Sequence, residues 1–173
     1  MPTLKTAALS SALLLLATTN CAWSTDFPKR QSGLWEIQSE VSRAAGLAPA
    51  QQCVGPNSDT AQQHLDRTIG RRGFCNLGPF IRNDNRVWIA QSTCRHRRKV
   101  VSTRKIATGD FVTHYRIDTI VRSQRKQRTR TLAQDILQAR YLGPCLAGQR
   151  PGDLVTPGMG TLNMTDGAFQ REK

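Results

Sequence analysis

Cysteine is the residue type in this sequence that is best suited to chemistry, because a thiol can form a disulfide, bind zinc or act as a nucleophile. Beyond residue 24 the chain contains Cys53, Cys75, Cys94 and Cys145. Even the closest two, Cys75 and Cys94, stand much farther apart in the sequence than the C-x-x-C pairs that are typical of zinc sites. Four widely spaced cysteines therefore favour two disulfides, for which three pairings are possible.

Strand geometry favours one of these pairings. A two-residue hairpin turn at 84–85 places Asn83 opposite Arg86. Counting outward along both strands then places Cys75 opposite Cys94, whereas Cys145 is expected at the other end of the sheet. Bridged cysteines need Cα atoms within about 7 Å, so we predict the pairs Cys75–Cys94 and Cys53–Cys145. The main rival is Cys53–Cys75 with Cys94–Cys145, and a bulge at 78–79 would shift the register on which the prediction depends.

The histidines and acids show no catalytic spacing. His64, His96 and His114 do not form an H-x-x-x-H or H-E-x-x-H motif, and no G-x-S-x-G motif is present. Glu36 and Glu40 share one strand face but stand about 13 Å apart, beyond the reach of a glycosidase carboxylate pair. The sequence therefore predicts no catalytic, cofactor or metal-binding residues, and a non-enzymatic protein.

Basic side chains form the feature with the clearest functional meaning. Lysine and arginine outnumber the acids by 25 to 12, for a net charge of +13. One cluster at a turn contains Arg95, Arg97, Arg98 and Lys99, and a second contains Arg122, Arg125, Lys126, Arg128 and Arg130. In an up-and-down meander alternate turns share one end of the sheet, so we expect both clusters to form one positive rim. Such a rim suits phosphate groups, although a merely solvated surface is the alternative.

Residues 1–24 have the features of a signal peptide. Lys5 precedes an apolar stretch from Ala7 to Ala17, which is too short to span a bilayer, and Ala22-Trp23-Ser24 offers a cleavage site before Thr25. Cys21 raises the alternative of a lipidated N-terminus, but its surroundings are unfavourable. We therefore expect a periplasmic or secreted protein with no transmembrane segment in the mature chain. Cleavage removes Lys5 alone among charged residues and leaves a net charge of +12.

The remaining chain alternates like a β protein. Strands are expected over 34–41, 87–94, 99–107, 111–121 and 129–142, with a turn at 83–85 and a bulge near Asp135. A loop is expected over 44–52, one short helix over 59–69, and irregular chain over 154–162. We predict a single disulfide-stapled domain over 25–165 and a flexible tail over 166–173. The fold class is mainly β with one short helix: an antiparallel up-and-down meander of about six strands, curled into a lipocalin-like half-barrel.

The two ends of this domain carry a family resemblance. The opening Phe27-Pro28-Lys29-Arg30 and Gly33-Leu34-Trp35-Glu36, together with the closing Tyr141-Leu142-Gly143-Pro144-Cys145 and Gly148-Gln149-Arg150-Pro151-Gly152-Asp153, resemble the bacterial domain-of-unknown-function family 3617. The four-cysteine frame fits that family too. The resemblance implies a small exported protein and no assigned activity, and the extra basic charge of this sequence goes beyond the family pattern.

Three functions remain as hypotheses. The first is a non-catalytic domain that binds an unknown partner or ligand in the cell envelope. The second is an electrostatic binder of anionic lipid or lipopolysaccharide through the positive rim. The third is an unrecognised hydrolase. Nucleic acid is a poor partner, because no aromatic residues that could stack on bases alternate with the arginines.

Overall fold

The computed structural model describes residues 28–59, 74–78, 80–83, 87–96, 99–126 and 128–172. The predicted helix over 59–69 lies outside these residues except for Asp59, as do the predicted signal peptide and Arg97 and Arg98 of the first basic cluster.

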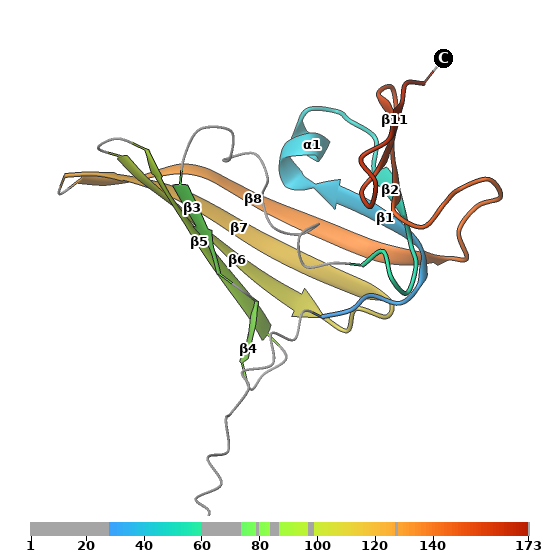
Figure 1. Ribbon diagram of the computed structural model, residues 1–173, viewed down its shortest axis with the longest axis horizontal. Helices are drawn as coiled ribbons and strands as arrows, with labels where there is room; N and C mark the ends of the chain where they lie inside the picture. The colour runs from blue at the N-terminus through green and yellow to red at the C-terminus, as the bar shows by residue number, and fades with distance from the viewer. Residues whose placement is uncertain are drawn as a thin grey trace, which may run out of the picture.

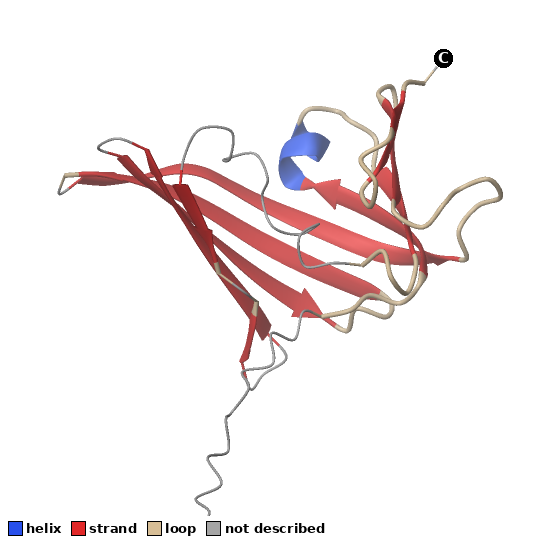
Figure 2. Cartoon of the chain, in the orientation of Figure 1, coloured by secondary structure: helices blue, strands red, loops and turns tan. Residues whose placement is uncertain are grey.

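The described chain forms one antiparallel sheet of eleven strands and one short helix (Figures 1 and 2). The strand order is β11-β10-β9-β2-β1-β8-β7-β6-β5-β3, and β4 also pairs with β5. The elements are β1 Gly33–Ser39, α1 Glu40–Ala44, β2 Ala50–Val54, β3 Phe74–Leu77, β4 Ile81–Asn83, β5 Val87–His96, β6 Lys99–Gly109, β7 His114–Arg125, β8 Arg128–Gly143, β9 Asp153–Thr156, β10 Gly160–Asn163 and β11 Phe169–Gln170.

The predicted meander is present in β5 to β8, which are the long strands that run side by side in Figure 1. The expected number of about six strands was wrong, because short strands extend the sheet at both edges. β1 lies beside β8, and β2 in the predicted 44–52 loop continues the sheet. The predicted irregular segment 154–162 contains β9 and β10. These strands are short, and Pro157 and Gly158 in the turn between them made the segment look irregular in the sequence. β11, which pairs with β10, lies within the predicted flexible tail over 166–173.

The sheet has one apolar side, called here the core face, and one polar side, called the outer face. Alternation along each strand separates them: Ala107, Tyr115, Ile117 and Ala139 lie on the core face with Trp35, which is fully buried. Among the described residues, four aromatic contacts connect this core, including Trp35 with Tyr115 at 5.3 Å between ring centroids. Because Trp35 is fully buried, we expect Trp35→Ala to lower the free energy of unfolding by about 3–5 kcal/mol.

The bulge in β8 lies closer to the hairpin turn than predicted. The register with β7 shifts where Val121 faces Ala133 and Arg122 faces Thr131, so Leu132 is the extra residue. The prediction near Asp135 came from a change of apolar phase in the sequence, from Leu132 and Ile136 to Leu137 and Ala139, whereas Ile136 faces Asp118 on the outer face. Because Ile136 is apolar although it lies on the outer face, it made the alternation of core and outer positions along β8 look as if it changed at Asp135.

The disulfide prediction rested on a wrong turn and still reached the observed register. Asn83 faces Val87 rather than Arg86, so three residues connect β4 and β5. The register shifts by one residue between Gly78 and Ile81 and restores the count, since Leu77 faces Ser92 whereas Ile81 faces Ile89. Gly78 still follows the first register: its N–H donates to the Gln91 carbonyl at 2.8 Å, and a Cβ there would clash with that oxygen. Cys75 consequently faces Cys94.

Cys53 and Cys145 are joined by a disulfide, with Cα atoms 5.3 Å apart, which confirms that pair. Cys94 is also disulfide-bonded. Its partner in the strand register is Cys75, whose side chain lies outside the described part of the structure, so the pair Cys75–Cys94 stays a prediction.

Candidate functional site

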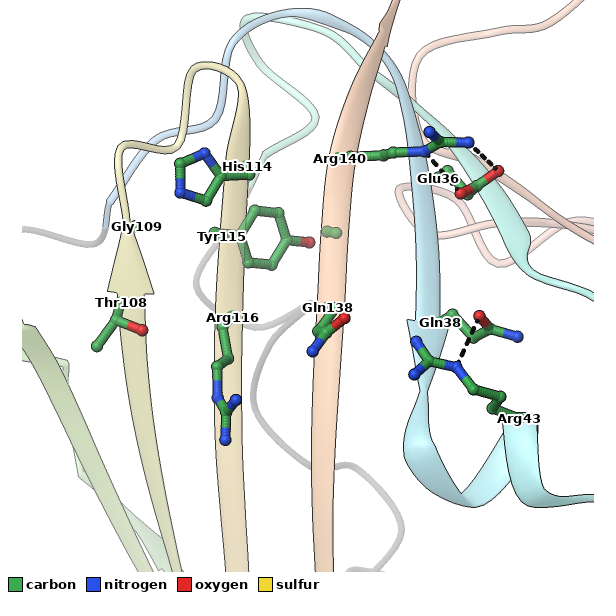
Figure 3. A pocket seen from close by; sticks show the side chains of 11 residues that line it. Glu36, Gln38, Arg43, Thr108, Gly109, His114, Tyr115, Arg116, Gln138 and Arg140 are labelled. Carbon is green, nitrogen blue, oxygen red and sulfur yellow. Dashed lines mark hydrogen bonds and ion pairs between the residues drawn. The ribbon is translucent and has the colours of Figure 1, made fainter.

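A groove of about 520 Å³ lies on the outer face, over β1, β6, β7 and β8 (Figure 3). Its size is within the range of pockets that hold small molecules. Most of the residues that line it have polar or charged side chains, and the lining consists of Glu36, Gln38, Arg43, Thr108, Gly109, His114, Tyr115, Arg116, Gln138, Ala139 and Arg140.

Strand register explains why these side chains meet. In one row across the sheet, Thr108 faces Arg116, Arg116 faces Gln138, and Gln138 faces Gln38. In the next row, His114 faces Arg140 and Arg140 faces Glu36. Directly opposed side chains on one face start about 5 Å apart, so each row forms a continuous polar strip.

Two of the arginines beside the groove are neutralised by carboxylates. Arg140 Nε donates to Glu36 Oε1 at 2.8 Å across the strand boundary. Arg116 donates from Nε and Nη2 to Asp118 on the same strand, and the shortest of these distances is 2.7 Å. The hydrogen bonds that Arg116 donates to the Asp118 carboxylate raise the pKa of Arg116. Arg116 and Arg140 are therefore held in ion pairs. They line the groove but do not add an unneutralised positive charge to it.

Arg43 is the groove arginine without a carboxylate partner in the described chain. Ser39 caps α1 by accepting a hydrogen bond from the Ser42 N–H at 3.0 Å, and this short helix carries Arg43 over β1. Arg43 Nε donates to Gln38 Oε1 at 3.2 Å, which leaves the remaining guanidinium N–H groups available (Figure 3). A guanidinium oriented in this way can bind a carboxylate or phosphate through two parallel hydrogen bonds.

Neutral hydrogen-bonding groups lie beside Arg43. Gln138 is exposed, and its side-chain amide makes no hydrogen bond within the residues that the structure covers. Figure 3 shows Gln138 between Arg116 and the Gln38–Arg43 pair. Thr108 adds a hydroxyl from β6. One free cation beside unpaired amide and hydroxyl groups suits a small polar ligand that carries one anionic group.

A rigid loop closes the His114 end of the groove. Asp110 Oδ1 accepts backbone N–H groups of Val112, Thr113 and His114 at 2.8 to 3.0 Å. The hydrogen bond from the Thr113 hydroxyl and these backbone bonds lower the pKa of Asp110. Gly109 precedes the loop with φ of +129°, and a Cβ there would lie 2.6 Å from the His114 carbonyl oxygen. The loop therefore needs both the aspartate and the glycine.

On the opposite face, Tyr115 connects the groove strands to a buried charged cluster. Arg30 donates from Nη1 to the Gln52 amide oxygen at 2.8 Å and to the Tyr115 hydroxyl at 3.1 Å. Burial opposes the charge of Arg30, but Tyr115 and Asp59 outweigh it and raise the pKa of Arg30. Burial also disfavours the charged form of Tyr115, and for a phenol this raises the pKa. Arg30 and Trp35 of the opening motif are thus structural residues that support the sheet beneath the groove.

The closing motif is structural as well. Asp153 accepts hydrogen bonds from the Arg150 N–H at 2.7 Å and from the Asn163 amide at 2.7 Å. The Gly152 N–H donates to the Cys53 carbonyl at 2.8 Å, next to the Cys53–Cys145 disulfide. Both ends of the family pattern therefore hold the fold together.

The basic clusters lie at one end of the sheet but on both of its faces. The β5–β6 and β7–β8 connections lie at the same end, as predicted (Figure 1). Register places Arg95 and Arg122 on the outer face. The side chains on the core-face side are Lys99, Arg125, Arg128 and Arg130, with Lys126 in the turn. All of these side chains are exposed.

Sequence reasoning missed the groove because it followed the inward positions of each strand. The alternate positions of the predicted strands 111–121 and 129–142 already contained Arg116, Gln138 and Arg140 as one outward set. Arg43 gave no signal, because it lies between the predicted strand over 34–41 and the predicted loop over 44–52, where the helix α1 was not expected.

The comparisons with known proteins identify the family. The model for the family described as "Protein of unknown function (DUF3617)" matches residues 30–145, and the chain belongs to that family. No curated protein and no solved structure matches. In the described residues no helix is long and apolar enough to cross a membrane. The same residues contain no group of three or more histidine, cysteine, aspartate or glutamate side chains that could hold a metal ion.

Proposed function

We propose that this chain is a non-catalytic binding domain that acts outside the cytoplasm, in the periplasm or the cell envelope, and holds a small polar, singly anionic ligand in the outer-face groove. The observation that carries the proposal is Arg43, whose guanidinium faces a groove of suitable volume and is not neutralised by a carboxylate in the described chain. The signal-peptide pattern and the disulfide support the location. An open, lipocalin-like half-barrel is the architecture that we propose for this role.

A hydrolase is less well supported by the same groove. Glu36 and His114 both line it and could serve as an acid and a base. However, Arg140 lies between them in the row, so they are two strand spacings, or about 10 Å, apart. Glu36 is also engaged by Arg140. Direct proton transfer between such groups and a shared substrate atom would need a different arrangement.

A second candidate function is binding to an anionic lipid surface. It is favoured by the strand ends that flank the two basic turns: the His96–Lys99 pair of β5 and β6 and the Arg125–Arg128 pair of β7 and β8 lie at one end of the sheet, about two strand spacings apart. Arg125 directly faces Arg128, and like charges opposite each other destabilise a strand pair. An anionic surface would relieve that repulsion.

Native mass spectrometry of the protein isolated from the cell envelope tests the first proposal. We expect the wild type to carry a small-molecule adduct, and Gln138→Trp to lack it because the indole fills the groove. Gln134→Trp is the matched control, since Gln134 lies on the same face of β8, is exposed and does not line the groove. Adduct loss in both variants, or in neither, would contradict binding in the groove.

A further inference from the structure

A second hollow on the outer face, separate from the groove, has the composition of an anion site. Its volume is about 240 Å³, and it is formed by β5, β6 and β7. The lining residues are Gln91, Ser92, Thr93, Ser102, Thr103, Arg104, Ile120 and Arg122. No acidic residue is among them.

Two guanidiniums converge on this hollow from neighbouring strands. Ser102 faces Arg122, and Arg104 faces Ile120, so Arg104 and Arg122 are diagonal neighbours on one face. Diagonal partners have Cα atoms about 7–8 Å apart, which is within the reach of long side chains. Both arginines are exposed, and neither forms a hydrogen bond or an ion pair with any residue that the structure describes. Arg116, further along β7, is instead neutralised by Asp118.

Neutral donors complete the hollow. Thr93 faces Ser102, which places two hydroxyl groups in the row of Arg122. Gln91 faces Arg104 and adds an amide. Ile120 supplies an apolar wall. Adjacent uncompensated cations destabilise a sheet, and the arrangement of donors around them matches an oxyanion with several acceptor oxygens.

We infer that this hollow binds the phosphate group of a phosphate monoester. The two guanidiniums hold the phosphate oxygens through charge-assisted hydrogen bonds, Ser102 and Thr93 donate their hydroxyls, and the organic part of the ester lies against Ile120. The site shares Arg122 with the basic clusters but adds Arg104, which the sequence analysis did not select. It does not depend on the groove, because it shares no lining residue with it.

Isothermal titration with glucose 6-phosphate, with glucose as the neutral match, tests the inference. We expect the wild type to bind the phosphate ester and not glucose, and Arg104→Gln and Arg122→Gln each to weaken binding at least tenfold. Arg171→Gln removes the same charge from an exposed position outside both basic clusters and both hollows, and should leave the affinity unchanged within about twofold. The absence of phosphate ester binding to the wild type, or equal losses in all three variants, would overturn the site.

A second arm distinguishes the source of the phosphate. Vesicles containing phosphatidate are compared with pure phosphatidylcholine vesicles at the same salt concentration. Loss of vesicle binding in Arg104→Gln but not in Arg171→Gln would assign the site to a lipid headgroup. Binding of the soluble ester with no such difference on vesicles would assign it to a soluble phosphate monoester.

Discussion

Arg30 and Asp59 form a buried ion pair, in which Nη2 of the guanidinium lies 2.9 Å from Oδ1 of the carboxylate. Their side chains are 0% and 3% exposed. Asp59 Oδ2 also accepts the Arg30 backbone N–H, at 2.6 Å. The pair therefore fixes the segment before β1 to the segment after β2, on the core side of the sheet that bears the groove.

Removing the carboxylate of this pair should be costly. We expect Asp59→Asn to lower the free energy of unfolding by about 3–5 kcal/mol, because the Arg30 charge stays buried without its partner. Urea denaturation followed by circular dichroism measures the change. Asp118→Asn is the control, since the Arg116–Asp118 pair is largely exposed and should contribute less than about 1 kcal/mol. Equal losses in the two variants would contradict the structural role of Arg30.

The two disulfides should appear as separate peptides. Non-reducing peptide mapping should recover Cys53 with Cys145 and Cys75 with Cys94. Replacing Cys53 and Cys145 together by Ala should cost about 4–5 kcal/mol of stability, because the bond closes a loop of 92 residues. A peptide that joins Cys53 to Cys75 would contradict both the pairing and the strand register.

The Asp110 loop should make a pH-dependent contribution to stability. The folded state lowers the pKa of Asp110 below its ordinary value of 3.8, so the contribution is complete above that pH and is lost as the pH falls below it. Asp110→Ala should therefore be less stable than the wild type at pH 7, with a difference that shrinks below about pH 4. Thermal unfolding at several pH values measures it, and a difference as large at pH 2 as at pH 7 would be inconsistent with the loop as described.

Charge reversal tests the lipid-surface candidate. Replacing Arg125, Lys126 and Arg128 by Glu should abolish sedimentation with phosphatidylglycerol vesicles at low salt, because the tip of the β7–β8 hairpin loses its positive field. The control reverses Lys29, Arg82 and Arg171, which are exposed and lie outside both clusters. If the two triple variants behave alike, the clusters are only a solvated surface.

Export gives a simple prediction of mass. The intact mass of the protein recovered outside the cytoplasm should correspond to a chain that begins at Thr25. A chain that begins at an acylated Cys21 would contradict the predicted cleavage site.

The predictable part of this fold was the part with long, regular alternation. Strand β7 followed its apolar positions closely, since Tyr115 and Ile117 point to the core. The edges were not predictable in the same way. β2 reads Ala-Gln-Gln-Cys-Val, and its burial depends on β1 and β9 beside it rather than on its own pattern.

The groove was less predictable than the fold, because it depends on register between strands. Gln138 and Gln38 are one hundred positions apart and become neighbours only when β1 pairs with β8. A meander drawn from sequence order alone has no reason to place β1 there. The basic turns could be predicted, but the bulge at Leu132 could not, and it moves Arg128 and Arg130 to the core-face side.

Amide chemical-shift mapping tests the central claim most directly. The ¹⁵N-labelled protein is titrated with a panel of hydroxylated carboxylates (glucuronate, gluconate and lactate), with glucose as the neutral match. We predict that at least one carboxylate shifts the amides of Gln38, Arg43 and Gln138, that glucose does not, and that Arg43→Gln removes the effect. Shifts that fall on the core face or the basic turns, or no shift at the groove with any carboxylate, would contradict the groove as the ligand site.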